Sequence, residues 1–200
     1  MKHPLACRCG QLNGYVVCSG HENRGICYCT DCQAFAKYLG QGSTVLDQAG
    51  GTEIVQTLSE FVHITEGKDA LRCIKLRERG LLRWYSACCK TPIANTPDNV
   101  NLAFVGLVHN CLEGQGHQPA ESFGTVKMAA FTESATSRLK PKAYGVPSAM
   151  MRIVIMLLKA RIFGGFKKNP FFNIETGQAI SPPRVLSADE LEQLKHNDAA

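Results

Sequence analysis

The 200-residue sequence predicts a mainly β fold followed by a C-terminal α-helical extension. Three observations carry this prediction. Between residues 11 and 108, short runs of β-forming residues alternate with turns that contain glycine. Most of the ten cysteines lie in three short blocks. Such blocks are typical of domains that metal ions or disulfides stabilise in addition to the apolar core. Near residue 148 the pattern changes to one long apolar helix.

Length and composition predict one domain with an appended segment. Two hundred residues with 44% hydrophobic content are enough for one core. We predict a β domain over residues 1–131 and a basic extension over residues 132–200. The extension is expected to contain a helix over residues 148–163 and a short helix over residues 188–196, the latter opened by a capping box at 187–190.

Local signals predict the individual elements. Thr30 or Asp31 is expected to cap a short helix that ends at Gly40, and Ser148 to cap the long helix that ends at Gly164. Strands are expected where β-forming residues lie between turns. These strands cover residues 11–18, 43–46, 53–57 and 102–108, with a hairpin over 70–85.

The most informative stretch is the run Cys27-x-Cys29-x-x-Cys32. It places three sulfurs within a few ångströms of one another before any tertiary contact forms. Disulfides fit poorly, because a C-x-C bridge is strained and three thiols leave one unpaired. Zn²⁺ binds thiolates in a tetrahedron, and three protein ligands with one open position are typical of catalytic zinc sites. The run therefore predicts a metal site, with plain buried thiols as the alternative.

Two further cysteine pairs predict a second metal site. Cys7 and Cys9 precede Gly10, which suits a turn whose backbone N–H groups point at a bound thiolate. Cys88 and Cys89 lie between an aromatic strand and a Thr-Pro turn. Two such half-sites would hold a four-ligand zinc and join the two ends of the domain. Core cysteines without a metal are the alternative.

The remaining cysteines and several histidines carry weaker signals. An isolated cysteine is most simply a small buried side chain, and an isolated histidine more often makes ordinary hydrogen bonds than binds metal. These residues are Cys18, Cys73, Cys111, His63, His109 and His117.

Cysteine usage also bears on the compartment. The first seven residues contain no apolar run that could serve as a signal peptide. We therefore expect the chain in the reducing cytoplasm, where clustered cysteines bind metal more often than they form disulfides.

The net charge of +5 is concentrated in the extension. Eight basic residues and no acidic one lie between Arg138 and Lys168, so 14 of the 22 lysines and arginines remain elsewhere against all 17 acidic residues. The apolar run 153–158 is far shorter than the roughly 20 residues of a membrane span. The helix must instead bury its surface on the β domain, in a second copy of the chain or in a membrane interface. Nucleic acid is a weaker candidate because the segment has few aromatic residues.

Taken together, the three cysteine blocks resemble the family of glutathione-dependent formaldehyde-activating enzymes and centromere protein V. The blocks are Cys7-x-Cys9-Gly10, Cys27-x-Cys29-x-x-Cys32 and Cys89-x-Thr91-Pro92, within residues 5–110. The resemblance implies an Mss4-like fold of coiled antiparallel sheets stapled by zinc. It also implies a structural zinc at Cys7, Cys9 and Cys89, and a second, open zinc site at Cys27, Cys29 and Cys32.

The third block departs from the family pattern, C-x-x-C-G-T-P. Ser86 stands at its first cysteine and Lys90 at its glycine. A serine hydroxyl stays protonated near neutral pH and is a poor zinc ligand. Cys88 could complete the structural site or turn toward the second zinc; otherwise the structural site is incomplete.

The C-terminal part resembles a sub-branch of the same superfamily that has no assigned function. The matching residues are Pro170-Phe171-Phe172, Thr176-Gly177 and Pro183-Arg184-Val185-Leu186. The likeness therefore supports a zinc site better than it supports a substrate.

Two hypotheses about function follow. The first is a zinc-dependent carbon–sulfur lyase that acts on a small thiol adduct such as a glutathione conjugate, with Lys37 and Arg83 as candidates for its carboxylates, although such side chains are more often solvated surface charges. The second is a non-catalytic zinc module whose basic extension contacts a second copy, a membrane surface or another partner. Thiol redox sensing through the Cys27 run is a third alternative.

Overall fold

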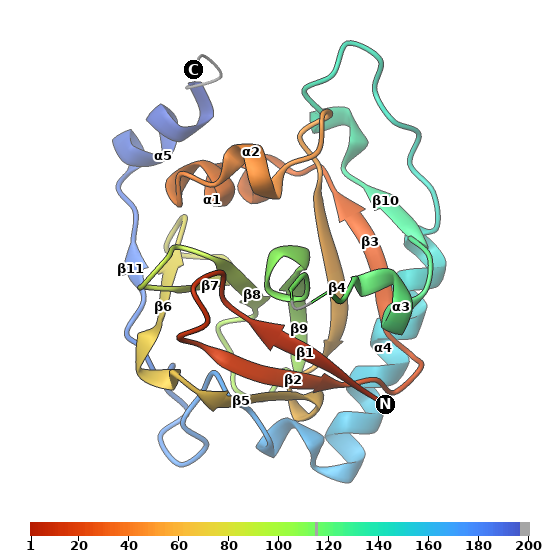
Figure 1. Ribbon diagram of the computed structural model, residues 1–200, viewed down its shortest axis with the longest axis vertical. Coiled ribbons are helices and arrows are strands. Elements are labelled where there is room, and N and C mark those ends of the chain that lie inside the picture. Colours follow the sequence, from red (N-terminus) through yellow and green to blue (C-terminus); the bar gives the residue numbers. More distant parts are fainter. Residues whose placement is uncertain (115, 197–200) are drawn as a thin grey trace.

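The computed structural model describes residues 1–114 and 116–196 and contains two β-sheets with helices around them (Figure 1). The fold is mainly β with a C-terminal helical segment, as the sequence predicts. The Mss4-like assignment stays a prediction.

The larger sheet has eight strands among the described residues. They are β3 (Asn23–Cys27), β4 (Thr52–Leu58), β6 (Leu71–Lys75), β7 (Leu82–Ser86), β8 (Pro92–Thr96), β9 (Phe104–Val108), β10 (Met128–Ala130) and β11 (Arg184–Val185). Their spatial order is β10-β3-β4-β9-β8-β7-β6-β11. The inner pairs are antiparallel, and the edge strands β10 and β11 pair in parallel with β3 and β6.

The smaller sheet has three antiparallel strands, in the order β1 (Lys2–Ala6), β2 (Asn13–Val17) and β5 (Val62–Glu66). The turn between β1 and β2 contains Cys7, Cys9 and Gly10, and the turn between β7 and β8 contains Cys88 and Cys89. Both cysteine pairs therefore lie at the ends of strands, where the chain reverses.

Helices surround the sheets. The α-helices are α1 (Thr30–Tyr38), α2 (Gly42–Val45), α3 (Pro119–Phe123), α4 (Val146–Phe163) and α5 (Ala188–His196), and the 3₁₀ helices are η1 (Ser59–Phe61), η2 (Lys68–Ala70), η3 (His109–Cys111), η4 (Thr132–Ser134) and η5 (Gly165–Lys167). Helix α4 contacts β4 and β10, while α5 lies next to α1 at the opposite side of the molecule (Figure 1).

Trp84 organises the main core. Its side chain is fully buried, and its indole Nε1 donates a hydrogen bond to Thr96 Oγ1 at 2.9 Å. The Phe171 and Phe172 rings lie 5.1 and 6.3 Å from it, centroid to centroid. Because these phenylalanines follow α4, the C-terminal segment supplies part of the core of the β domain.

Two predictions about elements before residue 50 are wrong. Residues 43–46, predicted as a strand, belong mainly to α2, because Val45 N donates to Gln41 O at 2.9 Å and Val45 is buried. The cap of α1 is neither Thr30 nor Asp31. Cys29 occupies this position, and its sulfur accepts a hydrogen bond from Cys32 N.

The helices of the extension match their predictions in type. Helix α4 begins two residues before the predicted start, with Gly145 as its N-cap at φ 69° in place of Ser148, and it ends at Gly164, where φ is 74°. The capping box of α5 is confirmed, because Glu190 N donates to Ser187 Oγ at 3.2 Å and Ser187 N donates to Glu190 Oε2 at 2.9 Å. Among the described residues, no helix combines the length and apolar character needed to cross a membrane.

Candidate metal centres

The run Cys27-x-Cys29-x-x-Cys32 forms a three-cysteine cluster. Cys27 is the last residue of β3, Cys29 is the N-cap of α1, and Cys32 lies in the first turn of α1. Their three sulfurs lie within 4.8 Å of one another. Cys32 N donates to Cys29 Sγ at 3.4 Å, so the positive end of α1 faces the cluster. This group could hold a metal ion.

Arg83 is the principal charged neighbour of the three-cysteine cluster. The residue is 4% exposed, and its Nη1 lies 3.6 Å from Cys32 Sγ and donates to Asn95 Oδ1 at 3.0 Å. Its Nη2 lies 3.8 Å from Asp31 Oδ2. The expectation that Arg83 is a solvated surface charge is therefore wrong. A buried guanidinium at this position offsets negative charge on the sulfurs.

The three thiols differ in acidity. Hydrogen bonds from Cys27 and Cys32 lower the pKa of the Cys29 thiol to about 2. Hydrogen bonds of Cys27 with Cys29 and Cys32 raise the pKa of the Cys27 thiol, because they favour its protonated form. Cys27 and Cys32 are buried against Met128 and Ala149, whereas Cys29 is half-buried. The most accessible sulfur is thus also the most acidic.

The second group is a four-cysteine cluster of Cys7, Cys9, Cys88 and Cys89. Cys9 Sγ lies 3.2 Å from Cys88 Sγ, and Cys7 Sγ lies 3.5 Å from Cys9 Sγ and 3.7 Å from Cys88 Sγ. Four thiolates around one ion at about 2.3 Å would be roughly 3.8 Å apart. The spacing therefore fits a tetrahedral metal ion. Of the three alternatives for Cys88, the geometry matches the one in which it joins the first site.

The backbone around the four-cysteine cluster has the form of two turns. Leu12 N donates to Cys7 Sγ at 3.3 Å, as expected for a turn that wraps a bound thiolate. Gly10 and Lys90 both follow a cysteine pair and both adopt left-handed conformations, with φ of 75° and 58°. Lys90 thus takes the backbone conformation for which glycine is preferred, so the turn is kept without the glycine.

Ser86 supports the four-cysteine cluster without belonging to it. Its Oγ lies 3.3 Å from Cys89 Sγ, and Thr91 Oγ1 lies 3.1 Å from the same sulfur. Burial raises the pKa of the Cys89 thiol, but the Ser86 and Thr91 hydroxyls outweigh burial and lower that pKa to about 5. The serine that replaces the expected cysteine therefore stabilises a neighbouring thiolate.

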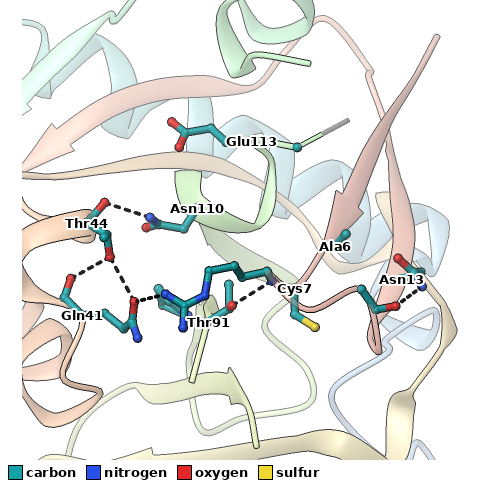
Figure 2. A pocket seen from close by; sticks show the side chains of 12 residues that line it. Ala6, Cys7, Asn13, Gln41, Thr44, Thr91, Asn110 and Glu113 are labelled. Carbon is teal, nitrogen blue, oxygen red and sulfur yellow. Dashed lines mark hydrogen bonds between the residues drawn. The ribbon is translucent and has the colours of Figure 1, made fainter. Parts of the chain in front are cut away.

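A cavity of about 370 Å³ adjoins the four-cysteine cluster, and Cys7 is among its lining residues (Figure 2). Arg8 Nη1 donates to Gln41 Oε1 at 3.3 Å, and Asn110 Nδ2 donates to Thr44 O at 2.9 Å. The cavity thus lies beside the four-cysteine cluster, whose sulfurs are already enough to complete a tetrahedron around a metal ion.

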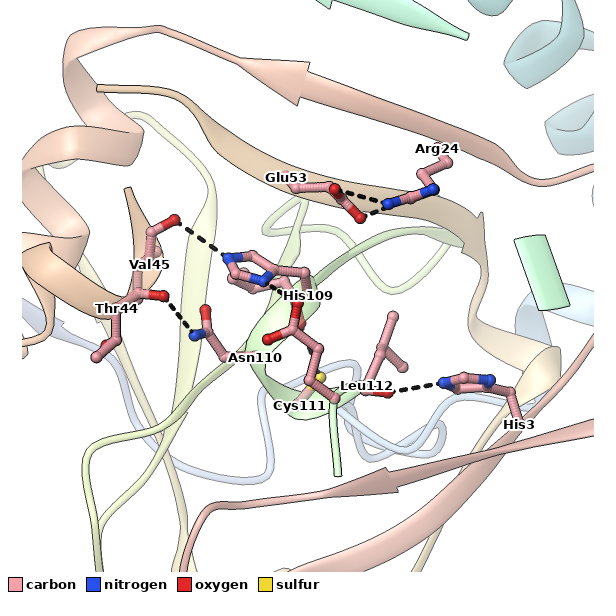
Figure 3. A network of polar contacts seen from close by, with 11 residues as sticks. His3, Arg24, Thr44, Val45, Glu53, His109, Asn110, Cys111 and Leu112 are labelled. Atoms are coloured by element: carbon pink, nitrogen blue, oxygen red, sulfur yellow. Dashed lines mark hydrogen bonds and ion pairs between the residues drawn. The ribbon is translucent and has the colours of Figure 1, made fainter. Parts of the chain in front are cut away.

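His109 belongs to a polar network (Figure 3) and is not a member of either candidate metal group. Its Nδ1 lies 2.7 Å from Glu113 Oε1 and its Nε2 lies 3.2 Å from Val45 O. Nearby, Arg24 Nε donates to Glu53 Oε1 at 2.6 Å. The ring of His109 is therefore fully engaged by its protein partners.

The other histidine candidates also lie outside the clusters. The His63 ring stacks on Tyr15 with centroids 4.6 Å apart, and His117 Nδ1 lies 3.6 Å from Glu121 Oε2. In the described part of the chain, the two candidate metal groups contain only cysteines.

The isolated cysteines pack as expected. All ten cysteines of the chain are free thiols. Cys73 is buried and its sulfur donates to Ser181 O at 3.2 Å, while the buried Cys111 sulfur donates to Val108 O at 3.1 Å. Cys18 is half-buried at the edge of the main core.

Comparison with protein families adds one finding. A family described as being of unknown function, DUF6151, matches residues 1–181. The chain belongs to DUF6151. The match includes both cysteine clusters, α4 and the core residues Phe171 and Phe172, whereas α5 lies beyond it. Comparison with curated proteins gives no match.

Sequence reasoning about this DUF6151 chain missed the groups that surround the sulfurs. One signal for Arg83 was present, since it lies between Leu82 and Trp84 in an apolar strand where a charged side chain needs a buried partner. The hydroxyls of Ser86 and Thr91 carried no such signal, because nothing in their spacing shows that they face a sulfur.

Proposed function

We propose that this DUF6151 chain binds zinc at both cysteine clusters. The support is the ligand chemistry, because sets made only of thiolates suit Zn²⁺ and exclude hard cations such as Mg²⁺ and Ca²⁺. Free thiols in this number also fit a reducing compartment, for which we propose the cytoplasm.

In this proposal the two centres have different roles. The four-cysteine cluster fills a tetrahedron and fastens the β1–β2 turn to the β7–β8 turn. The three-cysteine cluster supplies three ligands and leaves a fourth position for a substrate atom. The single observation that carries the distinction is the count of converging sulfurs, four in one group and three in the other.

The activity we propose for the three-cysteine centre is that of a carbon–sulfur lyase acting on a thiol–aldehyde adduct, such as the hydroxymethyl adduct of glutathione. The resemblance to glutathione-dependent formaldehyde-activating enzymes supports this choice. In such a reaction the carbon–sulfur bond breaks, its electron pair stays on sulfur, and the hydroxyl group loses its proton as the carbonyl forms. When bound, zinc would supply Lewis-acid stabilisation of the thiolate charge.

The chain's own residues would balance and position that charge. Three thiolates exceed the charge of one zinc ion by one, and the buried Arg83 guanidinium beside Cys32 Sγ offsets the excess. Asp31 and Asn95 hold Arg83 in this orientation. Of the three cysteines in this cluster, Cys29 is the half-buried one, so a substrate would reach the centre from the side of Cys29.

A non-catalytic zinc module is the second candidate. The observation that favours it is the burial of Cys27 and Cys32 against Met128 and Ala149, which leaves less room for a substrate than an exposed centre would. The cavity of about 370 Å³ also adjoins the four-cysteine cluster and not this one. Under this hypothesis both zinc ions would stabilise the fold.

Metal analysis tests the binding proposal. We expect close to two zinc ions per chain, close to one in Cys29→Ser, and two in the control Cys18→Ser, whose thiol lies outside both clusters. A wild-type content near one would contradict binding at one of the two clusters. Cys29→Ser would then show which: no further loss would mean that the three-cysteine cluster is empty, and loss of the remaining ion would mean that the four-cysteine cluster is empty.

An exchange experiment tests the activity. Glutathione and formaldehyde form their adduct reversibly, and NMR exchange spectroscopy follows both directions. We expect the zinc-loaded protein to raise the exchange rate by about tenfold or more, and Cys29→Ser to lose this effect. A rate equal to the protein-free control, with two zinc ions bound, would reject the lyase and leave the zinc module.

A further inference from the structure

Helix α4 attaches to the fold through one narrow stripe. Ala149, Met156 and Ala160 are its buried residues. Met156 and Ala160 pack against Leu58 and Ala103, and Asn23 Nδ2 donates to Ala149 O at 3.0 Å. At about 100° per residue these positions share one face, so the rest of the helix surface points away from the sheets.

The opposite face of α4 is apolar and exposed. The side chains there are 44–75% exposed, although they are large and apolar. They are Met150, Met151, Val154, Ile155, Leu158 and Ile162, and we call them the outer face of α4. Phe163 is 83% exposed at the C-terminal end of the helix, but by helical position it lies on the side of Met156. A contiguous apolar surface of this kind is unusual in a protein that is surrounded only by water.

Basic residues flank the outer face. By helical position, Lys159 lies along one side of it and Arg161 along the other. Arg152 lies on the Lys159 side but is half-buried, and its Nη1 donates to Asn23 Oδ1 of β3 at 2.9 Å. Five further basic residues lie before and after the helix, at Arg138, Lys140, Lys142, Lys167 and Lys168, and all five are exposed. No aspartate or glutamate occurs between Glu133 and Glu175. Basic residues therefore adjoin the outer face on the helix itself, and Lys167 and Lys168 follow its C-terminal end.

We propose that the outer face of α4 binds in the interface of an anionic lipid membrane. The helix would lie in the membrane plane, with its apolar side chains among the acyl chains and its lysines and arginines at the headgroups. Insertion across the bilayer is not involved, since no helix of the described residues has the necessary length and apolar character.

A membrane accounts for this surface better than a second copy of the chain. A two-fold dimer through α4 would bring Lys159 and Arg161 of both copies to one interface, with no acidic residue of the segment to pair with them. The outer face also belongs to a single helix at the surface. Lipid acyl chains can pack around such a helix without a preformed groove, and anionic headgroups complement the charge of its basic residues.

Vesicle sedimentation of the zinc-loaded full-length chain tests the proposal. We expect binding to vesicles of phosphatidylcholine and phosphatidylserine, weaker binding to phosphatidylcholine alone, and a decrease with added salt. Leu158→Glu with Ile162→Glu should reduce the bound fraction by about tenfold or more. Leu102→Glu is the matched control, because Leu102 is 43% exposed but lies before β9, and it should bind like the wild type.

Three outcomes would overturn the proposal. One is no binding to anionic vesicles. Another is equal loss in the Leu102→Glu control. The third is a dimer, seen by light scattering without lipid binding, that the α4 variant dissociates. Zinc content and the circular dichroism spectrum of each variant show that the fold is retained, and neither readout depends on lyase activity.

Discussion

The two cysteine clusters differ in where their sulfurs come from. Three sulfurs of one cluster belong to a single six-residue run, so their proximity needs no tertiary structure. In the other, Cys9 and Cys88 lie 79 positions apart, and their sulfurs meet only when the β1–β2 and β7–β8 turns converge. An ion at the four-cysteine cluster would therefore close a long loop and stabilise the fold, whereas an ion at the three-cysteine cluster would stabilise mainly its own segment.

The clusters also differ in how charge is balanced. Cys9 and Cys88 are exposed, so water can solvate the charge of four thiolates. Cys27 and Cys32 are buried, and the buried Arg83 guanidinium takes the place of water there. A surface cluster can therefore carry a larger net charge than a buried one without a protein counter-ion.

The largest difference should appear when one ligand is removed from each cluster. Cys7→Ser should lower the free energy of unfolding by about 4 kcal/mol, near the upper end for a single substitution, because the long loop loses its fastening. For a chain of this size the midpoint of thermal unfolding should fall by about 10 °C. Cys29→Ser should cost only about 1–2 kcal/mol.

Thermal unfolding followed by circular dichroism, together with zinc analysis, would measure both variants. Cys18→Ser serves as the control for replacing a half-buried thiol outside the clusters. If Cys29→Ser proved as destabilising as Cys7→Ser, the distinction between a fastening centre and a local one would fail.

The second-largest loss of stability is expected when the buried guanidinium of Arg83 is removed. Arg83→Met keeps the length of the side chain but leaves the thiolates and Asp31 without their guanidinium, and we expect a loss of about 3 kcal/mol in stability. Zinc at the three-cysteine cluster should also be lost to a chelator about tenfold more readily. Urea unfolding and chelator competition would measure these two changes.

Arg77→Met is the matched control, because Arg77 Nη1 pairs with the same Asp31 at 2.8 Å but its side chain is 48% exposed. It should change stability by no more than about 0.5 kcal/mol. Equal effects of the two substitutions would mean that Arg83 acts only through Asp31 and not on the sulfurs.

A smaller effect is expected from Cys88, because a water molecule can replace an exposed ligand. Cys88→Ser should cost about 2 kcal/mol and weaken zinc binding at the four-cysteine cluster. Adding Ser86→Cys to this variant should recover zinc binding, since the Oγ of Ser86 lies 3.3 Å from Cys89 Sγ. Zinc titration of the single and double variants would decide this, and failure to recover would show that the remodelled turn excludes a ligand at position 86.

Sequence reasoning succeeded where the signal was local. The spacing of Cys27, Cys29 and Cys32, the capping box at Ser187 and the glycine that ends α4 each act within a few residues. Residues 43–46 show the limit of such reasoning. Their β-branched side chains favour a strand, yet the burial of Val45 beside Ala36 and Val108 fixes a helical turn.

The contacts that surround the clusters and form the core join residues that are distant in the sequence, and these contacts were not predicted. Arg83 reaches Cys32 across 51 positions, and Phe171 reaches Trp84 from beyond α4. Spacing alone cannot show such contacts, because strand order decides them. The role of Cys88 was undecided for the same reason, since adjacent residues on an extended strand point to opposite faces, whereas in the turn its sulfur meets those of Cys7 and Cys9.

The smallest expected effect distinguishes the clusters by pH. Zinc leaves a thiolate site as protons compete for the sulfurs. The pKa of Cys89 is about 5 in the folded chain against an ordinary value of 9.0, so its stabilising contribution is present above pH 9 and is lost as pH falls through about 5. Ser86→Ala removes one donor to this thiolate and should raise its pKa.

The pH midpoint of zinc release from the four-cysteine cluster should therefore move upward by about half a unit in Ser86→Ala, the equivalent of one weak hydrogen bond. A zinc-sensitive dye during acid titration would report the midpoint, and Ser43→Ala, at an exposed serine, is the control. The three-cysteine cluster should keep its midpoint, because Cys27 and Cys32 donate to Cys29 there and Ser86 does not. A shift at both clusters would mean that Ser86→Ala destabilises the whole fold. It would contradict the inference that different residues stabilise the thiolates of the two clusters.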